Sequence, residues 1–140
     1  MWALYACGSA LTAAMVAVFG KIGLQSIDPT QATIIRGVVM AIILVIGGLL
    51  FGKLSGLNMA ALGGRAWIFI LLSACAGAAS WLLYFLALQA GPASAVSVLD
   101  KMSVVLVILF AALFLGEALT VRSIFGILFT IAGTLLIIFK

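Results

Sequence analysis

Charge is scarce in this sequence, and histidine is absent. Only 7% of the 140 residues are charged and three residues are acidic, whereas 67% are hydrophobic. Soluble domains are nearer half apolar, with about a quarter of their residues charged. A soluble fold of this length would lack the polar residues needed to cover its surface, so we expect lipid to be its main solvent.

The missing residue types also exclude several kinds of chemistry. Without histidine, and with its few acidic residues dispersed, the sequence offers no set of metal ligands. It shows no nucleophile beside a base, no phosphate-binding loop and no haem motif, so we expect no catalytic residue, no cofactor and no enzyme activity. The basic residues are scattered singly, which argues against a nucleic-acid partner. Cys7 and Cys75 are expected to be buried free thiols that serve as small apolar residues.

Long uncharged runs are what the sequence does contain. About 20 helical residues cross a hydrocarbon core of roughly 30 Å, and these runs are continuous rather than alternating as in a barrel. No basic residue precedes the first run, so we interpret it as a retained span rather than a signal peptide. We predict an all-α membrane protein and a single domain over residues 1–140, with five transmembrane helices at about 2–24, 30–51, 66–90, 93–115 and 121–139.

Local signals mark several helix ends. Asp28 is a good N-cap for the second span, and Pro29 suits the first helical position. Gly116 is typical of a helix stop, and Thr120 of a cap for the last span. The most polar loop is expected at Gly52–Gly64.

Small residues predict close helix packing within the membrane. Gly126 and Gly133 share one face of the last span, and Gly48 and Gly52 have the small-xxx-small spacing. The pattern leaves open whether the partner helix belongs to this chain or to another copy.

Three charged residues lie deep within the predicted spans. On insertion scales an ionisable side chain near the membrane centre costs at least ~2.5–3.5 kcal/mol. At ~1.5 Å per residue, Arg36 and Asp100 both lie roughly 9–11 Å below the same membrane surface, so they could form an ion pair. Lys101 is turned about 100° around the helix from Asp100 and is expected to point elsewhere.

These residues predict a polar substrate cavity within the membrane. The alternatives are structural ion pairs or snorkelling for the charges, and helix packing for the aromatic rings. The residues expected to line the cavity are Arg36, Asp100, Lys101, Trp81, Tyr84, Ser80 and Ser103.

The second half of the sequence resembles a known domain. The runs Ala87-Leu88-Gln89-Ala90-Gly91-Pro92-Ala93-Ser94 and Leu113-Phe114-Leu115-Gly116-Glu117-Ala118-Leu119-Thr120, followed by Gly126 and Gly133, carry the resemblance. They are similar to the EamA-type domain of the drug/metabolite transporter superfamily, in which the position of Arg36 is commonly basic.

The resemblance implies secondary transport of metabolites or lipophilic compounds. Most members fuse two five-helix domains into ten helices, related as an inverted repeat. This sequence carries one such set and would be one half of that fold. It departs from the usual pattern at Asp100-Lys101-Met102-Ser103, where many members are apolar or proline-bearing and where it looks like the short, single-domain members.

Charges are nearly balanced between the two membrane sides. Lys53, Arg65 and Arg122 fall on the side of the N-terminus, and Lys21 and Lys140 on the other, with Arg36 and Lys101 deeper but nearer that side. Orientation depends on such a bias. An odd number of spans with so little bias suggests insertion in both orientations and an antiparallel homodimer; pairing with a sister half-transporter is the other option.

The sequence as a whole favours a transporter or exporter of a small metabolite or lipophilic compound. We expect it in the inner (cytoplasmic) membrane, as a homodimer with alternating access and a small-molecule substrate; proton coupling through Asp100 stays open. One alternative is a non-transporting scaffold or accessory subunit. Another is a lipid flippase, in which Arg36 and Lys101 would contact an anionic headgroup.

Overall fold

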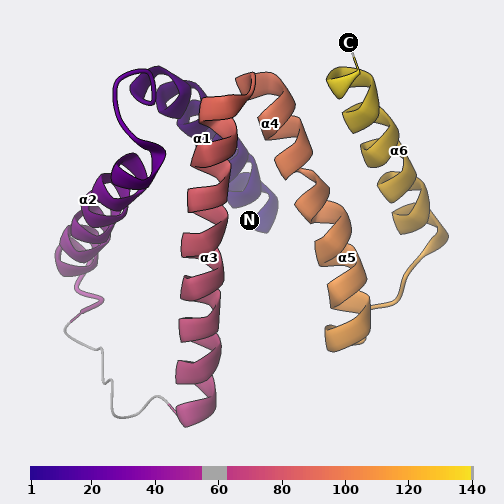
Figure 1. The fold of residues 1–140 in the computed structure, drawn as a ribbon. Helices are drawn as coiled ribbons and strands as arrows, with labels where there is room; N and C mark the ends of the chain where they lie inside the picture. The colour runs from indigo at the N-terminus through magenta and orange to yellow at the C-terminus, as the bar shows by residue number, and fades with distance from the viewer. Residues whose placement is uncertain (55–62, 140) are drawn as a thin grey trace. The chain divides into compact units, whose positions relative to one another are not determined.

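The computed structural model describes residues 1–54 and 63–139, and within them the secondary structure is helical, without strands. Of the expected Gly52–Gly64 loop, residues 55–62 lie outside the described part, as does Lys140. The helices, labelled in Figure 1, are α1 (Trp2–Gly23), α2 (Pro29–Leu50), α3 (Gly64–Ala90), α4 (Ala93–Asp100), α5 (Met102–Leu115) and α6 (Val121–Ile138).

Five segments of the described chain are long and apolar enough to cross a membrane. Four are the single helices α1, α2, α3 and α6, and the fifth is Ala93–Leu115, which joins α4 to α5. The prediction of an all-α protein with five candidate spans is confirmed. The fourth span differs from expectation because its helix is interrupted at Lys101.

The chain divides into two compact units, and each is described by itself. One contains Met1–Ile22 and Ala90–Lys140, and the other contains Gly23–Gln89. In the first unit α6 packs against both α4 and α5. The second unit contains α2 and α3, which the aromatic contacts of Arg36 join.

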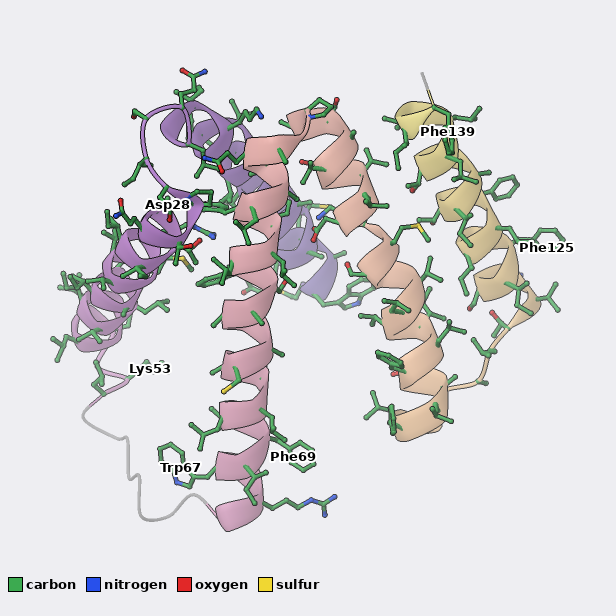
Figure 2. All side chains as sticks on the ribbon, viewed as in Figure 1. Asp28, Lys53, Trp67, Phe69, Phe125 and Phe139 are labelled. Carbon is green, nitrogen blue, oxygen red and sulfur yellow. The ribbon has the colours of Figure 1, made fainter. Side chains whose placement is uncertain are left out.

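The start of α2 is fixed by its cap. The Asp28 carboxylate accepts hydrogen bonds from the backbone N–H groups of Thr30 at 2.8 Å and Gln31 at 3.2 Å. Pro29 occupies the first helical position and is buried. Figure 2 shows Asp28 where α2 begins. The expected N-cap is therefore confirmed, and it satisfies two of the N–H groups that a helix start leaves without intrahelical partners.

The turn between α5 and α6 also follows the sequence signals. Gly116 ends α5 in the left-handed conformation, with φ of 70°, which glycine adopts at little cost. The Glu117 backbone N–H then donates to the Ala111 carbonyl at 3.2 Å. Thr120 caps α6, since its hydroxyl oxygen accepts from the Ser123 backbone N–H at 3.1 Å. Both expected ends are confirmed.

Most large apolar side chains lie on the outside of the helices. Phe125 on α6 is 56% exposed, and Phe139, directly after α6, is 81% exposed; both are labelled in Figure 2. Cys7 and Cys75 are free but exposed, so the expectation that they are buried is wrong. A helix surface that faces lipid can expose such side chains, whereas a soluble monomer rarely exposes large apolar patches.

The glycine pairs differ in what surrounds them. Gly48 and Gly52 serve the end of α2: Gly52 has φ of 64°, and the Gly48 carbonyl accepts from the Lys53 backbone N–H at 2.9 Å. A Cβ added at Gly126 or Gly133 would meet nothing within 4 Å. The face of α6 that carries these two glycines is therefore open to close packing.

Candidate functional site

Arg36 lies against two aromatic rings of α3. Its guanidinium carbon is 4.6 Å from the ring centroid of Trp81 and 5.3 Å from that of Phe85. Positions 81, 85 and 88 share one face of a helix, and this face holds the buried side chains of α3, with Phe85 4% and Leu88 0% exposed. The sequence thus places a cation of α2 on an aromatic surface of α3.

Stacking on the two rings offsets a substantial share of the cost of this charge. Cation–π contacts contribute about 0.5–2 kcal/mol each, the larger values applying to desolvated pairs. A charged side chain near the membrane centre costs at least ~2.5–3.5 kcal/mol. Between residues 23 and 89 the sequence holds one acidic residue, Asp28, whose carboxylate caps α2. Among the described residues of its unit, Arg36 therefore has aromatic support and no ion pair.

The other expected residues of α3 lie close by in sequence and differ in burial. Tyr84 is half-buried, and its ring centroid is 6.4 Å from that of Phe85. Ser80 is exposed, one position before the half-buried Trp81. The sequence prediction missed Phe85 as the second ring beneath Arg36. The signal that could have found it is its spacing, four residues after Trp81 on the same helix face.

Asp100 and Lys101 form an ion pair at the break between α4 and α5. The Lys101 ammonium nitrogen lies 3.6 Å from an Asp100 carboxylate oxygen, and the two side chains are 58% and 38% exposed. The expectation that Lys101 points away from Asp100 is wrong. The reason is that the flexible four-carbon stem of lysine bends back across the angle between consecutive residues. Ser103, two positions further on, is exposed.

The backbone tightens at this break. The Lys101 N–H donates to the Val98 carbonyl at 3.1 Å, and the Val104 N–H donates to the Lys101 carbonyl at 3.0 Å. Both bonds span three residues, as in a 3₁₀ turn rather than an α-helix, and such a turn within a helix often marks a hinge. The uninterrupted apolar pattern from residue 102 onwards gave no sign of it.

The expected pairing of Arg36 with Asp100 joins the two units. Arg36 belongs to the unit Gly23–Gln89, and Asp100 to the unit that contains α4. Because each unit is described by itself, this ion pair stays a prediction. What the structure adds is a competitor for it, since Asp100 is already in contact with Lys101.

A second lysine has a partner that the sequence did not suggest. The Lys21 ammonium donates a hydrogen bond to the Gly91 carbonyl at 2.9 Å, within one unit. The sequence placed Lys21 only on the membrane side opposite the N-terminus. Glycine and proline at a helix end leave carbonyl groups available, and lysine side chains often bind such carbonyls.

The five candidate spans and the charged groups set within them define a multi-pass α-helical membrane protein. The model of the EamA-like transporter family matches residues 1–139, and the chain belongs to this family. The family is one of transporters and not of enzymes, so the absence of a catalytic site expected from the sequence agrees with the family.

A curated relative supports the same conclusion. An "Uncharacterized transporter in cobO 3'region" from Sinorhizobium sp. is 43% identical over 136 residues, which cover 97% of this chain and 95% of the relative. The two chains are therefore similar in length. No solved structure matches this chain.

Proposed function

We propose that this chain is one half of a ten-helix secondary transporter or exporter of a small metabolite or lipophilic compound. The observation that carries the proposal is the match to the EamA-like transporter family over nearly the whole chain. In this proposal the two compact units act together as a single EamA-like domain over residues 1–140.

We further propose that two copies complete the transporter in the inner (cytoplasmic) membrane. Five candidate spans are an odd number, and the basic residues are nearly balanced between the two sides. An antiparallel homodimer would rebuild an inverted repeat from identical chains and allow alternating access. A sister half-transporter is the competing partner.

The proposed cavity uses the seven residues expected from the sequence. Asp100 binds the coupling proton or a cationic group of the substrate. Before that binding, Lys101 is paired with the Asp100 carboxylate. Support comes from the 3.6 Å ion pair at a helix break, because a hinge there could separate the two charges. The proposal also gives Arg36, Trp81 and Tyr84 a part in binding the substrate, and Ser80 and Ser103 would add hydroxyl groups.

Flux into proteoliposomes tests the proposal. We expect purified protein to give saturable flux of at least one compound from a broad metabolite panel, with a rate that changes when a pH gradient is imposed. Absence of flux across the panel would favour a scaffold or accessory subunit. Transfer of fluorescent phospholipid between leaflets, without flux of soluble compounds, would favour a lipid flippase, for which Arg36 is the specific observation.

A further inference from the structure

The three charges deep within the candidate spans are divided between the two units: Asp100 and Lys101 belong to one unit, and Arg36 belongs to the other. Asp100 and Lys101 contact each other and sum to zero. Arg36 shares its unit with a single acidic residue, Asp28, which lies eight positions earlier in sequence, or about 12 Å along a helix. Two backbone hydrogen bonds hold the Asp28 carboxylate at the start of α2, and the sequence of the unit places no acidic residue nearer to Arg36.

The contacts of Arg36 also favour one class of ligand. The ring centroids of Trp81 and Phe85 lie 4.6 and 5.3 Å from the guanidinium carbon of Arg36. The rings hold the guanidinium group in place, and this contact does not involve a carboxylate. A guanidinium presents its N–H donors in a planar fork, which matches the oxygen pairs of carboxylates and phosphates. Val39 and Met40, three and four residues further along α2, are apolar and would suit an apolar body attached to such a group.

We propose that Arg36, supported by Trp81 and Phe85, binds the anionic oxygen group of an amphipathic ligand, either a carboxylate or a phosphate. The inference rests on the proposed transport function and narrows its substrate class to anions with an apolar body. A soluble metabolite and a lipid headgroup share this chemistry.

Trp81 itself can report binding. Replacing Trp2 and Trp67 with phenylalanine leaves Trp81 as the sole tryptophan, since the chain has three. The protein is placed in phosphatidylcholine nanodiscs and titrated with hexanoate or hexyl phosphate, and with 1-hexanol as a neutral probe with the same apolar body. We expect a saturable change in Trp81 emission with at least one anion, and none with 1-hexanol.

Variants show whether Arg36 is responsible. Arg36→Gln should weaken anion binding by about 10- to 100-fold, the range for losing a charged hydrogen-bonding partner. Arg65→Gln is the matched control, because Arg65 also lies over an aromatic ring, 6.0 Å from Phe69. It should bind as the parent protein does. Arg36→Lys keeps the positive charge but lacks the planar fork of N–H donors. This variant should fold, and it should bind anions more weakly than the parent protein does.

A second nanodisc arm identifies the source of the anion. If nanodiscs with phosphatidylglycerol shift Trp81 emission and reduce hexyl phosphate binding, the ligand is a lipid headgroup; if soluble anions bind in both lipids, it is a soluble metabolite. Both results support the proposal.

Equal responses to 1-hexanol, unchanged binding by folded Arg36→Gln, or no response to any anion would overturn the proposal. If the protein gives flux but binds no anion, only the proposal that Arg36 binds an anion is overturned. If it binds anions but gives no flux, the proposed transport function is overturned.

Discussion

Asp100 and Lys101 are consecutive residues, and their charged groups lie 3.6 Å apart where the fourth span changes from α4 to α5. The pair removes net charge from this span while keeping an ionisable carboxylate within it. The 3₁₀-type turn around Lys101 gives the same place a backbone that can bend. In the function proposed above, this carboxylate is the group that would release Lys101 when it binds the substrate or the coupling ion.

Neutralising one member of this pair should cost more stability than neutralising both. Asp100→Asn or Lys101→Gln alone leaves an unpaired charge within the span, which costs at least ~2.5 kcal/mol near the bilayer centre. The double variant removes both charges, so its Tm in detergent should exceed that of either single variant. Scanning fluorimetry of the four proteins measures this. Strictly additive losses of Tm would show that the two charges do not interact.

Loss of the α2 cap should lower stability without changing transport chemistry. Asp28→Ala removes the acceptor for two backbone N–H groups and should cost about 0.5–2 kcal/mol. Asp28→Asn keeps a side-chain oxygen at the cap and is the matched control. Thermal unfolding compares the two variants. If Asp28→Asn were as destabilising as Asp28→Ala, the carboxylate charge rather than the cap would matter.

Two glycines of the last third of the chain should respond differently to alanine. Gly116→Ala forces a side chain into a left-handed conformation, at a cost of about 1 kcal/mol. Gly126 is helical and an added Cβ there meets nothing within 4 Å, so Gly126→Ala should leave the stability of the monomer unchanged or slightly raise it. Thermal unfolding of both variants tests the contrast. A loss with Gly126→Ala that depends on protein concentration would instead place this face in a dimer interface.

The sequence predicted the fold where one local rule decides the outcome. Five candidate spans follow from the length of the apolar runs, and the caps Asp28 and Thr120 and the stop at Gly116 follow from side-chain chemistry at helix ends. The bond from Lys21 to Gly91 joins residues 70 positions apart, and no local rule specifies such a contact.

The candidate site was harder to predict, because burial and pairing depend on which helix faces meet. Arg36 was identified from its depth. The spacing of Phe85, four residues after Trp81, placed it on the same helix face, but that this face meets Arg36 follows only from the contact between α2 and α3. Lys101 was misplaced because helical angles describe where a Cβ points, not where a flexible four-carbon stem ends.

Dual topology predicts equal labelling from both membrane sides. In a background with Cys7 and Cys75 replaced by alanine, a single cysteine is placed at Ser26, between α1 and α2, or at Ala118, between α5 and α6. Neither substitution changes a charge. In intact cells, an impermeant thiol reagent should label about half of the protein at each site, as two orientations in equal amounts require. Full labelling at one site and none at the other would establish a single orientation and remove the antiparallel dimer.

Flux through the Asp100→Asn protein in proteoliposomes shows whether this chain forms a transporter with Asp100 in its cavity. Wild-type protein and the Asp28→Asn control should carry the same substrate across the membrane, whereas flux through folded Asp100→Asn protein should fall to the level of protein-free liposomes. Full flux through well-folded Asp100→Asn protein would contradict this expectation.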